Sequence, residues 1–212
     1  MIKENDVRID TSLLHPNLRY KLNKLLKTCN NVGIYLIITE GFRTKERQDE
    51  LYAQGRTKPG NIVTNARGCD FNSQHQWGIA FDIAIRYVDN PYDVNIIKKV
   101  ADIAKDKPIN LSWGGDWTDF RDYPHFYLGN WGSNTRMLKN NYILFSTFQK
   151  TWSGKVRRKR GLNIWSTYKI KGRKRKIKLD YNTKVSILWK HTKWAKVRYK
   201  GIIGYMRSKY LK

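Results

Sequence analysis

Cysteine and long apolar runs are the scarcest features of this 212-residue sequence. Its two cysteines, Cys29 and Cys69, are too few for a disulfide framework, and we expect both thiols to be reduced. No apolar run approaches the roughly 18 residues that a membrane-spanning helix needs. The first six residues, Met-Ile-Lys-Glu-Asn-Asp, are polar, so we expect no secretory signal. These absences exclude a small disulfide-stapled protein and a helical membrane protein.

Acidic residues are almost missing from the C-terminal part of the chain. Residues 151–212 hold 21 lysines and arginines but one acid, Asp180, which gives this segment a formal charge of +20. Residues 1–150 hold 21 basic and 16 acidic residues, a formal charge of +5. This uneven distribution indicates two domains with different partners, and it predicts an anionic partner for the second domain.

Histidine is also rare, with four residues, yet two of them suit a metal site. His75 lies seven residues before Asp82, and His125 follows about forty residues later. Two imidazoles and one carboxylate leave the fourth position of a tetrahedral zinc free for water, which is the composition of a catalytic zinc site. In the alternating run 78–85, Asp82 falls on the face of small residues, where an ion has room. Because seven is an odd number, the chain must turn between the two ligands, and Gly78 can supply that turn.

A second acid lies beside the third candidate ligand. Asp122 stands three residues before His125, across Pro124. A carboxylate held there can take the proton of the attacking water, so Asp122 is the candidate general base. The alternative is that Asp82 and Asp122 are solvated turn acids and the histidines ordinary surface or core residues. Spacing by itself leaves both interpretations open.

Two blocks of this sequence resemble the LAS-type zinc peptidases, the family of D-alanyl-D-alanine carboxypeptidases and phage L-alanyl-D-glutamate peptidase endolysins. The first block is S-Q-H-Q-W-G-I-A-F-D at 73–82, and the second joins W-G-G-D-W to D-Y-P-H-F. The resemblance runs from about Asn17 to Leu128. It implies that Asp122 is the catalytic acid and base. It also implies a set of Zn²⁺ ligands, namely His75, Asp82 and His125.

The resemblance extends to residues that would contact the substrate. G-F-R-x-x-x-x-Q, which contains Arg43 and Gln48, resembles a family element whose arginine faces the scissile peptide. Such a guanidinium would hold the carbonyl oxygen as negative charge develops on it. Gln48 would contact substrate together with Ser73 of the first block. The alternative for Arg43 is a surface ion pair with Asp49 or Glu46.

Two tryptophans flank a pair of glycines in Leu111-Ser-Trp-Gly-Gly-Asp-Trp117. Glycines between aromatic residues suit a loop whose backbone passes close to a substrate. Trp113 and Trp117 would then line the site. Packing of these rings in the core is the alternative.

The rest of residues 1–134 predicts an α+β catalytic domain, with a small antiparallel sheet flanked by helices. Apolar periodicity predicts helices over 18–31, 44–54 and 94–106. Continuous or alternating apolar runs predict strands over 34–39 and 78–85 and from His125. We expect a linker over residues 135–153.

Five short runs of period two follow, separated by glycine and asparagine turns, and they predict a small all-β barrel over residues 154–212. The order G-L-N-I-W, V-S-I-L-W and W-A-K-V-R-Y-K-G-I-I-G-Y-M resembles bacterial SH3 domains of cell-wall enzymes. One departure is Trp165, where that family more often has arginine. The resemblance implies a domain that binds the cell wall.

These features predict a modular zinc peptidase, an endolysin that cuts the stem peptide of peptidoglycan. The D-x-P-H form and the G-R-T-K-P-G loop resemble the endolysins, so we favour the L-alanyl-D-glutamate bond over D-alanyl-D-alanine carboxypeptidase activity. A monomer is expected, made in the host bacterial cytoplasm and acting on the wall after release, with peptidoglycan and anionic wall polymers as partners.

A nucleic-acid-binding protein without catalysis is the alternative from another class. In that case the basic runs 157–160 and 173–176 would follow phosphates. Charge alone cannot distinguish phosphates of nucleic acid from those of wall polymers, and solvated loops would also explain the runs. An open zinc site has no use in a binding module, so we expect no nucleic-acid partner.

Overall fold

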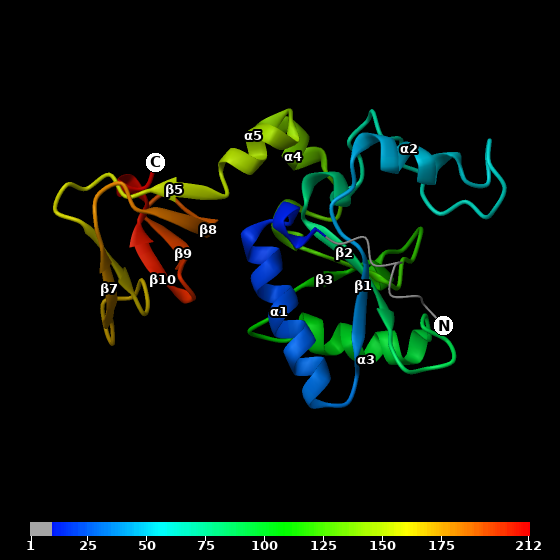
Figure 1. Cartoon of the computed structure of the whole chain (residues 1–212), viewed down its shortest axis with the longest axis horizontal. Coiled ribbons are helices and arrows are strands. Elements are labelled where there is room, and N and C mark those ends of the chain that lie inside the picture. The colour runs from blue at the N-terminus through cyan, green and yellow to red at the C-terminus, as the bar shows by residue number, and fades with distance from the viewer. Residues whose placement is uncertain (1–9) are drawn as a thin grey trace. The chain divides into compact units, whose positions relative to one another are not determined.

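The computed structural model describes residues 10–212, which divide between Phe145 and Ser146 into two compact units. Each unit has its own sheet (Figure 1). The polar N-terminal hexapeptide, for which we predicted no secretory signal, lies outside the described residues. Within them, no helix is both long enough and apolar enough to cross a membrane.

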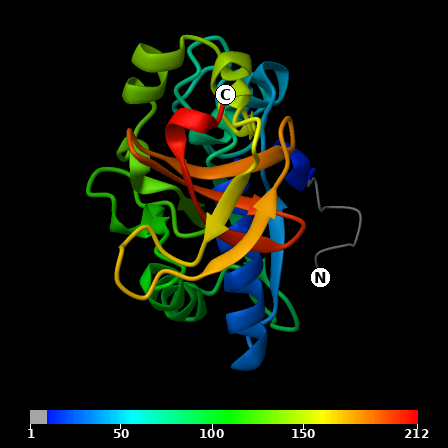
Figure 2. The ribbon, with the colours of Figure 1, turned by 90° about the vertical axis from the view of Figure 1, so that its left-hand side faces the viewer.

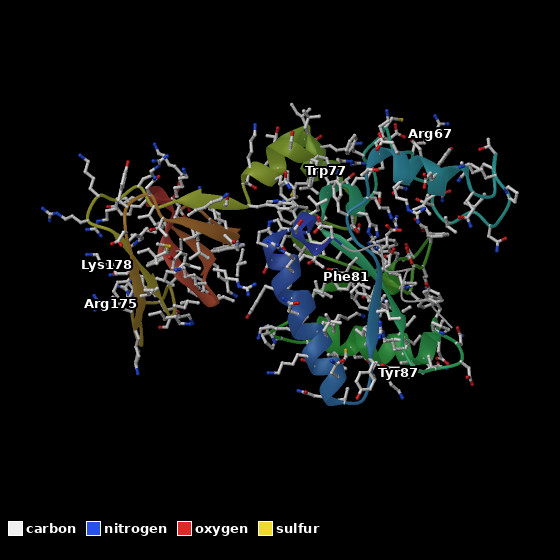
Figure 3. The ribbon with its side chains drawn as sticks, viewed as in Figure 1. Arg67, Trp77, Phe81, Tyr87, Arg175 and Lys178 are labelled. Carbon is white, nitrogen blue, oxygen red and sulfur yellow. The ribbon has the colours of Figure 1, made fainter. Side chains whose placement is uncertain are left out.

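The first unit is built on a four-stranded antiparallel sheet in the order β1-β2-β4-β3. Its strands are β1 (Leu36–Glu40), β2 (Ala80–Ile85), β3 (Ser112–Trp113) and β4 (His125–Tyr127). Phe81 of β2, labelled in Figure 3, is fully buried and stacks on Phe126 of β4 with ring centroids 5.9 Å apart. The apolar face that alternation predicts for β2 therefore forms part of the core.

Three helices of nine residues or more belong to this unit: α1 (Pro16–Asn31), α2 (Lys45–Ala53) and α3 (Val94–Lys105). α1 begins where His15 Nδ1 accepts a hydrogen bond from the backbone N–H of Asn17. α3 begins at Asp93, whose carboxylate accepts from two backbone N–H groups of the first turn. Both helices bury an apolar face, and the predicted α+β fold is confirmed.

The stretch predicted as a linker, residues 135–153, contains two short helices, α4 (Arg136–Tyr142) and α5 (Phe145–Lys150). Thr135 Oγ1 donates a hydrogen bond to the carbonyl of Phe71, and Lys139 Nζ donates to Asn72 Oδ1 at 2.8 Å. These contacts place residues 135–142 in the first unit instead of in a linker. The sequence misses this because single hydroxyl and ammonium groups hold the segment, with one buried apolar residue, Leu138.

The second unit is a six-stranded antiparallel sheet in the order β5-β8-β9-β10-β6-β7, whose strands can be followed in Figure 2. The strands are β5 (Ser153–Lys155), β6 (Leu162–Trp165), β7 (Arg175–Leu179), β8 (Lys184–Lys190), β9 (Trp194–Tyr199) and β10 (Ile202–Arg207). A buried cluster that includes Ile164, Val197 and Met206 forms the core of this unit. Trp165 lies on β6 with the Arg173 guanidinium 4.6 Å from its ring centroid.

The sixth strand, β7, is the one that sequence periodicity did not predict. It contains three basic residues in five, and part of it falls in the basic run 173–176, for which a solvated loop was one of the two interpretations. Arg175 and Lys178, labelled in Figure 3, are exposed, whereas Leu179 is buried. The strand therefore has one apolar side, but its lysines and arginines make the alternation of apolar and polar residues hard to detect in the sequence.

Candidate metal and catalytic site

Three acidic or imidazole side chains lie in one row across the sheet of the first unit. The register pairs Glu40 of β1 with Asp82 of β2, and Asp82 with His125 of β4. Directly opposed residues on neighbouring strands point to the same face. Strand register alone thus brings together two residues that are 43 positions apart in the sequence.

His75 reaches the same place from a 3₁₀ helix, η3 (Gln74–Trp77), that precedes β2. Gly78 ends this helix in the left-handed conformation, with φ of 63°. A residue with a side chain is strained in that conformation, which explains glycine here. The predicted turn between His75 and Asp82 is therefore present at Gly78.

The three side chains converge on one point. His75 Nε2 and His125 Nδ1 lie 3.2 Å and 3.0 Å from Asp82 Oδ1, and the two ring nitrogens are 3.1 Å apart. All three ligand atoms lie within 4.8 Å of one another, so the group could hold a metal ion. Two imidazole nitrogens and one carboxylate oxygen are a donor set typical of zinc.

The outward nitrogen of each imidazole has its own acceptor. His75 Nδ1 lies 2.7 Å from the carbonyl oxygen of Gly41, and His125 Nε2 lies 2.8 Å from Gln74 Oε1. Because both partners are acceptors in these pairs, the outward nitrogens carry the protons and the inward nitrogens keep their lone pairs. Such outer contacts fix the tautomer and orientation of metal-binding histidines.

The electrostatics favour neutral imidazole beside a charged carboxylate. Burial, together with the nearby Arg43 guanidinium, lowers the pKa of His75 to about 4. Burial opposes charge on Asp82, but the surrounding His75, His125 and Arg43 side chains hold the pKa of this carboxyl well below its usual value. Neutral imidazole and ionised carboxylate are the forms that bind metal.

Asp122 lies in the same pocket, three residues before β4 begins at His125. Burial and the charge of Asp82 raise the pKa of the Asp122 carboxyl. Its backbone packs against Gly114, where an added Cβ would come within 2.5 Å of Asp122 O and 3.0 Å of His125 Cβ. One of the two glycines between the tryptophans therefore lets the loop approach the segment that contains Asp122 and His125.

Arg43 forms ion pairs inside the site. Its NH2 group donates to Asp82 Oδ2 at 2.8 Å, and its Nε lies 3.8 Å from Glu40 Oε2. The alternative partners that we considered, Asp49 and Glu46, are not the acids that it pairs with in the described residues. The guanidinium holds the carboxylate oxygen of Asp82 that does not face the histidines.

The residues predicted to bind substrate separate into two groups. Ser73 and Trp117 line the pocket, and Trp117 Nε1 donates to the hydroxyl of Tyr127. Gln48 is fully buried, and its amide donates to Thr64 Oγ1 and the carbonyl of Ala66. Trp113 is outside the pocket lining. Its ring is buried, and its Nε1 donates to the carbonyl of Tyr123.

The pocket has a volume of about 530 Å³ and contains the three candidate ligands, Asp122 and Arg43. One buried donor beside it, Gln74 Nε2, has no hydrogen-bond acceptor within the described part of the chain. Unsatisfied buried donors are costly unless a ligand supplies acceptors. The pocket is thus suited to a ligand rich in carbonyl or carboxylate oxygen.

Sequence reasoning missed two side chains of this site, Glu40 and Gln74. Glu40 ends an apolar strand and is itself buried, with both Arg43 and Arg47 as partners. An acid at the end of an apolar strand was a usable signal. Gln74 gave no signal, because it lies in a 3₁₀ helix of four residues that shows no apolar periodicity.

Comparison with known proteins gives one family match whose range includes His75, Asp82, Asp122 and His125. A family profile described as D-alanyl-D-alanine carboxypeptidase matches residues 67–128. The peptidoglycan L-alanyl-D-glutamate endopeptidase CwlK of Bacillus subtilis is 46% identical over 123 residues, which cover 53% of this chain and 71% of that protein. The L-alanyl-D-glutamate peptidase of Listeria phage A118 is 31% identical over 126 residues, covering 58% of this chain and 40% of that protein.

Solved structures give similar but weaker likenesses. The L-Ala D-Glu endopeptidase ChiX of Serratia marcescens has a TM-score of 0.44 and 20% identity, over 58% of this chain and 86% of that one. A vancomycin-resistance D,D-pentapeptidase, VanY, solved with Zn(II), has a TM-score of 0.42 and 18% identity, over 64% of this chain and 83% of that one.

Proposed function

Because this chain belongs to the peptidase family M15, we propose that it hydrolyses the L-alanyl-D-glutamate bond of the peptidoglycan stem peptide. The observation that carries the proposal is the 46% identity to an endopeptidase of that specificity, over most of that protein's length. D-alanyl-D-alanine carboxypeptidase activity is the second candidate, because the matching family profile is described by that activity.

We propose His75, Asp82 and His125 as the ligands of a zinc ion. Their inward-facing lone pairs, their close approach and the buried acceptors behind both rings support this assignment. Zinc bound by this set would supply Lewis acidity, which lowers the pKa of a water molecule and polarises a carbonyl group.

Asp122 is proposed as the group that moves protons. Its raised pKa favours a carboxyl that accepts a proton from the attacking water and then donates it to the leaving amine. The pocket position of Asp122, beside His125, supports this role.

Arg43 and Gln74 are proposed to position the reacting groups. Arg43 holds Asp82 through one nitrogen, and charge on its guanidinium would stabilise an oxyanion in the same pocket. The free amide hydrogens of Gln74 would donate to a carbonyl or carboxylate of the stem peptide. Ser73 and Trp117 line the pocket where such a peptide would lie.

The second unit is proposed to hold the enzyme on the wall through anionic polymers. Its 21 lysines and arginines against Asp180, from residue 151 onward, support an anionic partner. Its SH3-like strand order in the sequence supports the wall as the place where that partner is found. Binding of this kind would raise the local concentration of the peptidase at its substrate.

The test of the proposed reaction is digestion of purified peptidoglycan, followed by mass spectrometry of the freed termini. New N-terminal D-glutamate and C-terminal L-alanine are expected, and both should disappear after chelation of zinc. The Asp122→Asn variant is the matched control for a contaminating hydrolase. Release of free D-alanine alone would instead support the carboxypeptidase.

A further inference from the structure

Four aromatic rings surround an open pocket of about 430 Å³ on the second unit, far in the sequence from the metal site. Two of them are strongly exposed: Tyr168 by 48% and Trp189 by 41%. Trp194 and Tyr205 complete the aromatic lining. Large exposed aromatic residues that gather around a hollow usually mark a binding site.

Strand register explains why these rings face outward. Lys196 of β9 lies between Trp189 of β8 and Tyr205 of β10, since the register pairs it with both. The neighbouring residues of β9, Ala195 and Val197, are buried in the core of the unit. Because side chains alternate along a strand, the row that contains Lys196 lies on the opposite face. The side chains of Trp189 and Tyr205, which lie in this row with Lys196, therefore do not fill the core.

The rings are held in place by one another. Trp189 and His191 lie parallel, with an interplanar angle of 6° and centroids 5.6 Å apart. Tyr168 meets Tyr205 edge to face at 5.3 Å. Because packed rings lose little freedom on binding, this surface can bind a flat apolar ligand at a low entropic cost.

The charge around the pocket has one sign. Lys193 and Lys196 line it, and the lining contains no acid. Arg207 lies next to it, with its guanidinium 4.4 Å from the ring centroid of Trp194. Asp180 is the single acid from residue 146 onward. The ligand that complements this pocket combines a flat apolar face with an anionic group.

We propose that this pocket binds the glycan strand of peptidoglycan, at a sugar ring whose attached stem peptide carries a free carboxylate. The C–H face of the sugar packs on the rings of Trp189 and Tyr168, while Lys193 meets the carboxylate. This inference deepens the proposed function and depends on it for the choice of glycan. A peptidase gains from a second contact with the same polymer that it cuts, whereas a nucleic acid would not bring it to its substrate.

The test is cosedimentation of the full-length protein with peptidoglycan stripped of its phosphate polymers. An Asp122→Asn background prevents digestion of the wall during the measurement. Trp189→Ala should weaken binding by at least about tenfold, as loss of a central aromatic anchor does. Tyr168→Ala provides a second variant should the first fail to fold. Tyr181→Ala is the matched control, because Tyr181 is an equally exposed aromatic residue of the same unit outside the pocket.

Two further arms identify the ligand. Lys193→Ala should weaken binding to stripped peptidoglycan, whereas Lys171→Ala, at an exposed lysine outside the pocket, should not. Cleavage of a soluble stem peptide by Trp189→Ala with native Asp122 should equal that of the parent protein, which separates this inference from the proposed reaction. Equal losses for Trp189→Ala and Tyr181→Ala would overturn the pocket. Loss of binding when the phosphate polymers are removed would contradict the glycan as the ligand. Tighter binding to single-stranded DNA than to peptidoglycan at equal salt would contradict it as well.

Discussion

The imidazole rings of the metal site each have two distinct nitrogens, one bound to an acceptor of the protein and one facing the centre. Removing any of the three proposed ligands leaves two, which are too few to fix the ion. Single alanine variants of His75, Asp82 and His125 should therefore lose stoichiometric zinc and all hydrolysis. Inductively coupled plasma mass spectrometry of the purified variants measures the zinc content per chain. A variant that keeps one zinc per chain would not have lost a ligand.

Asp122 separates metal binding from chemistry. We expect Asp122→Ala to keep its zinc but to lose about 10²- to 10⁴-fold in kcat, the usual contribution of general acid–base catalysis. Stem-peptide cleavage and metal content are measured on the same preparation. A loss of less than about tenfold would assign the proton transfer to another group.

Gln74 tests whether the outer contact of His125 matters. Gln74→Leu removes the acceptor for the ring N–H of His125, and loss of such a contact typically lowers metal affinity or activity by about 10- to 100-fold. Gln74→Glu supplies a stronger acceptor and should restore zinc affinity. Competition with a chromophoric chelator measures that affinity in both variants. Equal zinc affinities for Gln74→Leu and the parent protein would show that the hydrogen bond between Gln74 and His125 does not contribute to metal binding.

Much of this site was predictable at the residue scale, because strand alternation fixes the face of Asp82 and an odd spacing requires the turn at Gly78. The outer contacts were not. Gly41 contributes a backbone carbonyl, and Gln74 a side chain within a 3₁₀ helix of four residues, where no periodicity of apolar residues reveals orientation. Trp113 shows the same limit, since composition could not decide between a pocket ring and a core ring.

At the scale of elements, α1 depends on a buried histidine. His15 is 6% exposed, accepts a hydrogen bond from Asn17 and meets the edge of the Trp131 ring. Burial, with a smaller contribution from the charge of Arg19, lowers the pKa of His15 to about 3. The unfolded chain binds a proton there near pH 6.5, whereas the folded chain does not. The stability from neutral His15 is thus complete above pH 6.5 and is lost progressively as pH falls towards 3.

His15→Asn should reduce this pH dependence, because asparagine also caps helices but does not titrate. Between about pH 7.5 and pH 5, the free energy of unfolding of the parent should fall by about 2 kcal/mol more than that of the variant. Urea unfolding at both pH values measures the difference. Parallel losses in the two proteins would place the titration elsewhere.

Helices and buried strands were predictable where apolar residues repeat, as in α1 and α3. β7 was not, because its lysines and arginines are exposed and leave only Leu179 buried and Ile177 partly buried against the core. The position of such a strand is determined by the neighbouring strand to which it is hydrogen-bonded, and the periodicity of its own sequence does not reveal it. β7 pairs with β6, whose alternating Leu162 and Ile164 are buried.

At the scale of the whole molecule, we propose that the first unit hydrolyses the stem peptide and the second unit binds the wall. Deleting residues 146–212 should leave cleavage of a soluble stem peptide within about twofold, because every proposed catalytic residue lies before the division. On intact walls the loss should be much larger, since tethering acts through local concentration. Turbidity loss of a wall suspension and peptide cleavage, measured side by side, give the comparison. A truncated chain as active on walls as the full one would contradict the division.

The row formed by Glu40, Asp82 and His125 makes this enzyme more sensitive to chain length than to many substitutions. Removing Ala80 or Phe81 from β2 would turn Asp82, and every following side chain of the strand, to the opposite face of the sheet. A deletion between Gly55 and Gly60 shifts no strand register. A scan of single-codon deletions in the first unit should therefore abolish activity within the strands, where a deletion changes the register. Deletions in the loops between the strands should be tolerated.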